Sequence, residues 1–228
     1  MKFILGKKID MTQVFREDGT VVPVTRVQAG PCVVTQIKTA DKDGVESVQV
    51  GFGKQKNFRL NKAEQGHLKD IHTDEDKTMT VRFLRDFKTN SENVLKRGDV
   101  FTVGIFSPGE KVSVVGFAKG RGFQGVVKRH GFRGGPASHG HKDNLRMPGS
   151  IGAGGVQRTF KGIRMGGHMG DNRVTVHNLE IVEVHPETNE IYIKGAVPGA
   201  RNGVLSIHTA EGKIMVESQQ TAGENTVA

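Results

Sequence analysis

The segment 115–173 limits most strongly what this chain can fold into, because it combines positive charge with many glycines. It holds eleven Lys and Arg against only Asp143 and Asp171, a net charge of +9 in 59 residues. It also carries 16 of the 31 glycines and four of the nine histidines. Within it, the stretch "KRHGFRGGPASHGHKDNLRMPGS" at 128–150 offers only Phe132, Leu145 and Met147 as bulky apolar side chains. We therefore expect the segment to contribute little to any hydrophobic core.

The rest of the chain is electrically neutral. The protein has 228 residues and a net charge of +9, and the 169 residues outside the segment hold equal numbers of cationic and anionic side chains. A solvated face does not concentrate excess charge so completely, whereas a surface for a polyanion does. The charge distribution therefore favours a nucleic-acid partner.

Short strand-like runs lie on both sides of the basic segment. They are separated by turn signals such as "REDGT", "ADKDG", "SPG", "PETN" and "PGARN". Runs such as "VVPVTRVQ", "DVFTVGIF", "EKVSVVGFA" and "NEIYIKGAV" place Val, Ile, Thr and Phe at near-alternate positions, which predicts antiparallel strands. Many short, evenly spaced strands are typical of a small closed barrel. We expect a mainly β fold, with the basic segment inserted into the barrel as a long loop.

This pattern divides the chain into parts. We expect residues 1–114 to form the first part of the barrel and residues 174–214 its last part, with the basic loop at 115–173 between them. Residues 57–88 are charged throughout and predict a small α/β excursion with a short helix near Lys62–Leu68. The last eleven residues, "SQQTAGENTVA", are small and polar, and we expect residues 215–228 to form a disordered tail.

The single cysteine and the lack of long apolar runs indicate the compartment. Cys32 cannot form an internal disulfide, and its apolar neighbours in "PCVVTQI" predict a small buried side chain. The N-terminus "MKFILGKKID" lacks the apolar stretch of a signal peptide, and no run approaches the roughly 18 apolar residues of a membrane span. We expect a cytoplasmic protein without a membrane partner.

One motif resembles a nucleotide-binding loop. "GRGFQG" at 120–125 is a literal G-x-G-x-x-G after a strand-like run. A dinucleotide fold needs a helix directly after these glycines, and "VVKRHGFRGG", with three more glycines, predicts no such helix. We therefore expect no cofactor, and we interpret the glycines as positions where the backbone approaches a phosphate chain closely.

Metal binding and catalysis are weaker interpretations of the same segment. His130, His139 and His141 lie close together, but only Asp143 is near, there is no cysteine, and the surrounding cations would repel a metal ion. Ser138 next to His139 does not give triad geometry, and no paired carboxylates are present for acid–base work. We expect no metal site, no catalytic residue and no enzymatic activity.

Nucleic-acid binding fits the segment best, with a solvated flexible loop as the alternative. Cations spaced between glycines can follow a phosphate backbone, and Arg, which outnumbers Lys seven to four here, favours bidentate phosphate contacts and stacking. The candidate contact residues are Lys119, Arg121, Lys128, Arg129, His130, Arg133, His139, His141, Lys142, Arg146, Arg158, Lys161, Arg164, His168 and Arg173.

Several long motifs together carry a family resemblance. With "SPGEKVSVVGFAKGRGFQGVVKRHGFRGGPASHGH", "LRMPGSIG", "NRVTVHNLEIVEV" and "IKGAVPGARNG", the chain resembles bacterial members of ribosomal protein family three of the large subunit. The start, "GKKIDMTQVFREDGTVVPVTRV", is similar too. The resemblance covers nearly everything from Lys2 to about Ile214.

The resemblance implies a fold and a role. It implies a six-stranded barrel of the translation-factor type and a primary rRNA-binding protein that nucleates assembly near the 3′ end of large-subunit rRNA. It also implies a loop that threads through rRNA, with its tip at about 147–160 near the peptidyl transferase centre. Neighbouring proteins would be numbers fourteen and nineteen of the large subunit, not a second copy of this chain. The tip residues would be Pro148, Gly149, Ser150, Ile151, Gly152, Ala153, Gly154 and Gly155.

The chain departs from the family pattern at a few positions. Ser113 stands where Asp or Asn is usual, and Ala118 stands where Ser or Thr is usual, so local turn contacts differ. Ala153 occupies the place of a glutamine that is methylated in some relatives, so we expect no such modification there. The alternative function is a free-standing RNA-binding translation factor or RNA-modifying enzyme built on the same barrel.

Overall fold

The computed structural model describes residues 1–69, 71, 78–89, 95–209 and 214. The chain forms two compact units, one made of Met1–Gly116 with Val174–Ala228 and one of Phe117–Arg173. We call the second the basic unit, because it holds all eleven cations of the basic segment. No helix within the described ranges is long and apolar enough to cross a membrane. The disorder predicted for 215–228 concerns residues outside those ranges.

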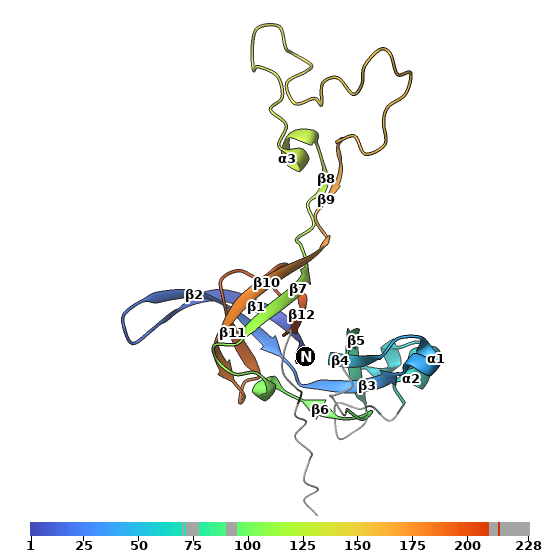
Figure 1. Ribbon diagram of the computed structural model, residues 1–228, viewed down its shortest axis with the longest axis vertical. Helices are drawn as coiled ribbons and strands as arrows, with labels where there is room; N and C mark the ends of the chain where they lie inside the picture. Colours follow the sequence, from blue (N-terminus) through green and yellow to red (C-terminus); the bar gives the residue numbers. More distant parts are fainter. Residues whose placement is uncertain (70, 72–77, 90–94, 210–213, 215–228) are drawn as a thin grey trace, which may run out of the picture. The chain divides into compact units, whose positions relative to one another are not determined.

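The first unit contains a closed barrel of six strands, which confirms the predicted mainly β fold and antiparallel barrel (Figure 1). Around the barrel the strands follow the order β1, β12, β7, β10, β11, β2. Their bounds are Phe3–Phe15 for β1, Val21–Ala29 for β2, Lys111–Phe117 for β7, Arg173–His185 for β10, Glu190–Lys194 for β11 and Val204–His208 for β12.

Alternation of apolar and exposed positions explains why these segments become barrel strands. On β2, Val27 and Ala29 are buried while Gln28 between them is exposed, and on the neighbouring strand β11 both Ile191 and Ile193 are fully buried. Side chains two residues apart on a strand lie on the same face, so these residues fill the barrel interior. Register shifts between Lys8 and Asp10 and between Ile181 and Glu183 mark bulges, which help the strands to curve.

A second sheet of four strands, in the order β5, β4, β3, β6, lies in the same unit. Its strands are β3 at Cys32–Lys38, β4 at Ser47–Lys56, β5 at Met79–Lys88 and β6 at Val100–Phe101. The short helical elements of this part are α1 at Ala40–Asp43, η1 at Asn57–Arg59, α2 at Lys62–His67 and η2 at Val103–Ile105. The helix predicted near Lys62–Leu68 is therefore present as α2.

Two details differ from the sequence-based expectation. The part of the first unit outside the barrel runs from Cys32 to Phe101, which is wider than the interval 57–88, because β3 and β4 pair with each other and not with barrel strands. Alternation alone does not tell which sheet a strand joins. The run "DVFTVGIF" also forms a strand only over Val100–Phe101, after which the chain turns as η2 and buries Val103.

The barrel and the second sheet share one hydrophobic core. Phe3 of β1 stacks on Phe87 of β5, with ring centroids 4.5 Å apart, and meets Phe101 of β6 edge-on at 6.0 Å. Val34 and Val48 of the second sheet belong to the same buried cluster as the barrel interior. The second sheet therefore stabilises the barrel wall against which it packs.

The basic unit contains three short elements. Strands β8 at Gly122–Gln124 and β9 at Gly167–Met169 form a two-stranded sheet, and α3 at Val126–His130 follows β8 (Figure 1). Between α3 and β9, residues 131–166 form neither helix nor strand and appear as the long yellow coil of Figure 1.

Candidate nucleic-acid interface

A short antiparallel stem closes the basic unit at its base. Phe123 of β8 pairs with His168 of β9 at the centre of this stem. Three further backbone hydrogen bonds extend it. Arg121 N–H donates to Met169 O at 2.9 Å, and two bonds join Ala118 to the chain that follows β9. In those two, Ala118 N–H donates to Asn172 O at 2.9 Å and Asp171 N–H donates to Ala118 O at 3.2 Å.

Gly170 fits the stem only because it has no side chain. Its φ of +81° lies in the left-handed region, which L-residues other than glycine avoid. A Cβ atom at this position would lie 2.2 Å from the carbonyl oxygen of Lys119 and 2.9 Å from Cα of Gly120. The two chains of the stem therefore approach each other more closely here than any side chain allows.

A helix does follow the glycines of "GRGFQG", so the prediction of no helix was wrong. α3 spans only Val126–His130 and ends where Gly131, at φ +72°, donates to Val126 O and Val127 O. Its last turn carries Lys128, Arg129 and His130, and cations are favourable at a helix C-terminus. The remaining parts of a dinucleotide fold do not follow, because β8 pairs with β9 in a two-stranded antiparallel sheet.

Two of the candidate contact residues also hold the unit together. Arg129 donates from Nη1 to Met165 O at 2.8 Å, and Nε2 of His130 lies 3.0 Å from the same oxygen. The guanidinium of Arg129 also lies against Gly167, where a Cβ atom would come within 2.7 Å of Nη1. These side chains therefore link α3 to the chain returning towards β9.

The glycine pair at 134–135 lets two parts of the coil meet. Gly135 N–H donates to Leu145 O at 2.9 Å, and a Cβ atom on Gly134 would lie 2.4 Å from that oxygen. The contact places Gly134, which follows Arg133 in the chain, beside Arg146, with the Cβ position of Gly134 3.7 Å from Cα of Arg146. Arg133 and Arg146 are both predicted contact residues, and they lie on the two segments of the coil that this hydrogen bond joins.

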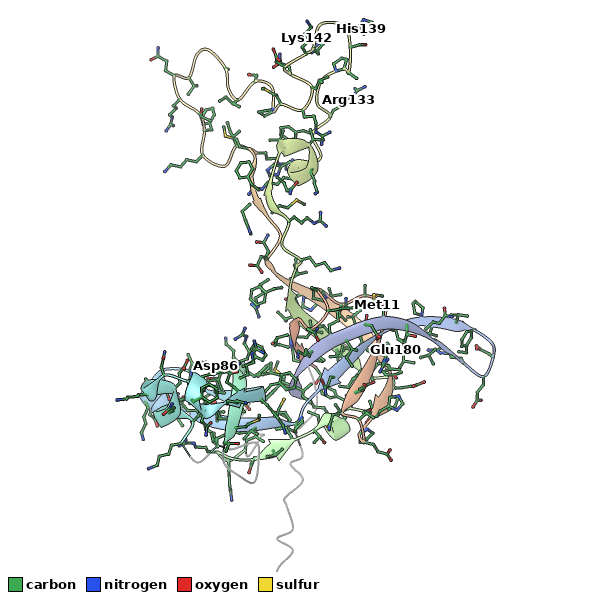
Figure 2. All side chains as sticks on the ribbon, turned by 180° about the vertical axis from the view of Figure 1, so that it is seen from behind. Met11, Asp86, Arg133, His139, Lys142 and Glu180 are labelled. Carbon is green, nitrogen blue, oxygen red and sulfur yellow. The ribbon has the colours of Figure 1, made fainter. Side chains whose placement is uncertain are left out.

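The cations of the basic unit have no anionic partners within it. None of its eleven Lys and Arg forms an ion pair with a described carboxylate, although Asp143 and Asp171 belong to the same unit. Arg133, His139 and Lys142 extend from one lobe of the coil beyond α3 (Figure 2). Because no internal charge neutralises these side chains, they attract an external polyanion.

The basic unit also lacks a hydrophobic core. Val126, 3% exposed, is its single buried side chain, whereas Phe123 is 78% and Phe160 53% exposed. The guanidinium of Arg158 lies 5.8 Å from the centroid of the Phe160 ring, within cation–π range. Exposed rings beside cations suit stacking on bases.

The structure places the predicted contact residues on distinct elements. Lys119 and Arg121 precede β8, His168 lies on β9, and Arg173 opens β10. The coil carries Arg133, His139, His141, Lys142, Arg146, Arg158, Lys161 and Arg164. His139 adopts φ +61° in a turn, and no group of three His, Cys, Asp or Glu side chains in the described ranges is placed to hold a metal ion.

The predicted tip at 148–155 is exposed throughout and carries no charge. Ser150 Oγ donates to Gly152 O at 2.8 Å, and Val156 N–H donates to Ala153 O at 3.3 Å, so a local turn shapes it. Ile151 is 42% exposed. An uncharged, compact turn of this kind can lie close to other groups without the desolvation of an ion.

The sequence reasoning missed the internal contacts of the unit. Arg129 was expected to face nucleic acid, but its bond to Met165 O shows that part of its role is structural. The doublet at Gly134 and Gly135 was a usable signal for a close approach of two chains, because neighbouring glycines leave the backbone uncovered.

The fold and this unit define a class of protein: a small closed β-barrel that carries a basic, glycine-rich segment without a core. Residues 65–190 match the family described as Ribosomal protein L3. The chain is 54% identical over 208 residues to the large ribosomal subunit protein uL3 of Herpetosiphon aurantiacus, covering 91% of this chain and 95% of that protein. The proteins of the same name from Heliobacterium modesticaldum and Roseiflexus sp. are 51% and 50% identical, over 92% and 91% of this chain and 97% and 96% of theirs.

A match over more than half of the chain, together with relatives this similar along almost their whole length, is decisive. The chain belongs to the ribosomal protein L3 family.

Proposed function

We propose that this chain is a structural constituent of the large ribosomal subunit that binds large-subunit rRNA through its basic unit and nucleates assembly near the 3′ end of that rRNA. As a member of a ribosomal protein family it acts in translation, in the cytoplasmic ribosome, and not as an enzyme. Family membership favours this role over the free-standing factor and the RNA-modifying enzyme considered from sequence.

One observation carries the proposal. The basic unit holds eleven cations that form no ion pair with a described carboxylate, and it buries a single side chain. A segment with neither a core nor internal charge compensation needs a partner that supplies both contact surface and negative charge. The RNA backbone supplies one negative charge per nucleotide, so it meets both needs.

The family resemblance supports finer assignments within this proposal. The fifteen cationic and imidazole side chains named above would contact rRNA, with Arg129 and His130 also bracing the unit. The uncharged tip, Pro148–Gly155, would extend towards the peptidyl transferase centre. Large-subunit proteins fourteen and nineteen would be the protein neighbours.

The salt dependence of rRNA binding tests the proposal. If five or more cations meet phosphates, log affinity for a large-subunit rRNA transcript should fall with log salt at a slope of roughly −4 or steeper. Replacing Arg133, Lys142 and Arg146 with Ala should flatten that slope by about two to three units, because about 0.7 to 0.9 is lost per phosphate contact. Arg129 is left in place because it also holds Met165.

A matched control removes three cations from the first unit. Arg16, Lys38 and Lys194 each form an ion pair with a carboxylate, so the triple Ala variant changes net charge equally without touching the basic unit. We expect its slope to stay near that of the unchanged chain. If both triple variants flatten the slope equally, net charge alone, and not the basic unit, determines how binding depends on salt.

A further inference from the structure

An exposed aromatic side chain lies between two cations in the first unit, far along the sequence from the basic unit. Phe58, in η1, is 75% exposed. The Nζ atom of Lys56 lies 5.9 Å and Cζ of Arg59 lies 5.7 Å from the centroid of its ring. Both distances are within the range of cation–π attraction. The ring is therefore held beside two positive charges and still presents most of its surface to solvent.

The turn that carries Phe58 is fixed by its neighbours. Asn57 N–H donates to Thr78 O at 3.1 Å, next to the start of β5. From α2, Nε2 of Gln65 donates to Asn57 O at 3.1 Å and to Leu60 O at 2.9 Å. Leu60 packs against the small buried cluster beside the second sheet. Because Leu60 already supplies the apolar contact of this turn, Phe58 is not needed for the core.

The chain segment that carries this ring has charges of one sign. From residue 54 to residue 62 the sequence "KQKNFRLNK" carries four cations and no carboxylate. The next carboxylate, Glu64, accepts the backbone N–H of Asn61 at 3.0 Å in the cap of α2. Two residues before Lys56 on β4, Lys54 lines a cavity of about 270 Å³ together with Lys7 and Arg82. Cationic side chains therefore extend along β4 from Lys56, beside the ring, to Lys54 at this cavity.

We propose that Phe58 is a stacking platform for an unpaired RNA base, with Lys56 and Arg59 contacting the phosphates on either side of it. The proposal rests on rRNA being the partner of this chain, and it adds a second RNA contact outside the basic unit. A flat, exposed ring that is carried on a hydrogen-bonded turn and flanked by cations matches both the face and the backbone of a nucleotide. An acidic peptide satisfies the cations but gains little from the exposed ring face.

Substitutions distinguish the contribution of Phe58 stacking to RNA affinity from the contribution of the charges on Lys56 and Arg59. Phe58→Leu should weaken binding of the full chain to a large-subunit rRNA transcript by about fivefold to a hundredfold, the range for loss of one stacked base. The salt slope should not change, because no phosphate contact is lost. Phe58→Trp should restore binding. Replacing Lys56 and Arg59 with Ala should instead flatten the slope by about one to two units.

Phe15→Leu is the matched control, because Phe15 is 65% exposed on the barrel strand β1 and has no cation over its ring among the described residues. Its affinity should equal that of the unchanged chain. Thermal unfolding of both Leu variants should be unchanged, since both rings are exposed. If Phe58→Leu binds as tightly as Phe15→Leu, the stacking proposal is wrong.

Photo-crosslinking identifies the occupant directly. The change Phe58→benzoylphenylalanine should give crosslinks to rRNA in assembled large subunits. Crosslinks to a ribosomal protein alone would overturn the proposal. If the unchanged chain does not bind rRNA at all, the proposed function is refuted as well. If the unchanged chain binds rRNA and substitution of Phe58 does not change its affinity, only this inference is refuted.

Discussion

The close approach at Gly170 predicts a large local effect of adding one methyl group. In the stem of the basic unit, Gly170 has φ +81° and no room for a Cβ atom, because the carbonyl oxygen of Lys119 would lie 2.2 Å away. Gly122 of β8 has a similar φ of +65°, but nothing lies within 4 Å of its Cβ position. Comparing Gly170→Ala with Gly122→Ala therefore separates the clash of a new Cβ atom from the cost of placing alanine at a positive φ.

The magnitudes follow from the contacts of the stem. An L-residue in the left-handed region costs about 1–2 kcal/mol, and both variants carry this cost. Gly170→Ala must also move Lys119, which breaks the backbone bonds made by the N–H groups of Ala118, Arg121 and Asp171. At about 1 kcal/mol for each bond, the stem of Gly170→Ala should be less stable than that of Gly122→Ala by about 3 kcal/mol.

Amide hydrogen exchange measures this difference without requiring the whole protein to unfold. A difference of about 3 kcal/mol corresponds to roughly a hundredfold faster exchange of the Ala118, Arg121 and Asp171 amides, since about 1.4 kcal/mol is a factor of ten. Amides of the barrel strands should exchange at the same rate in both variants, because the stem belongs to the other unit. Equal exchange of the three stem amides in both variants would refute the steric argument.

Three further predictions concern other parts of the chain. Burial raises the pKa of the Cys32 thiol to about 12, so the folded protein should not react with a thiol reagent at pH 8 and should react fully once unfolded; rapid labelling of folded protein would contradict the buried position. Limited trypsin digestion of the free protein should cut between 119 and 164 before it cuts the barrel, because that stretch is mostly exposed coil, and early cleavage within 21–38 is the contrary result. Deleting Ser150–Gly155 should leave rRNA binding and large-subunit yield nearly unchanged but alter single-turnover peptide transfer, because the tip carries no charge; a collapse of assembly with normal peptide transfer would assign the tip to assembly instead.

Much of the barrel was predictable because its strands have one buried and one exposed face. The alternation at Val27, Ala29, Ile191 and Ile193 requires an interior on one side, and the turn signals divide the chain into strands of suitable length. The separate sheet was not predictable in the same way, because Val34 and Val48 show similar local patterns but lie on strands that pair within the second sheet. Which strands pair depends on contacts between distant residues, and a local pattern does not encode them.

The basic unit was predictable from charge and glycine content, but its internal structure was not. Composition located the excess cations, since charge counts do not depend on fold. The helix α3 was missed because a five-residue helix has almost no periodic signal and its capping glycine, Gly131, suggested a loop. The bracing role of Arg129 was missed because nothing in the sequence pairs it with the carbonyl of Met165, 36 residues away.

The point where the basic unit leaves the barrel determines how freely its length can vary. β7 and β10 are neighbours in the closed barrel, so the connection between Phe117 and Arg173 begins and ends on adjacent strands, as a hairpin turn does. By the logarithmic law of loop closure, extending a turn of a few residues to this length costs the barrel only about 2 kcal/mol. The barrel thus tolerates almost any insertion here, so selection can lengthen, shorten or rewrite the segment for its partner without redesigning the scaffold.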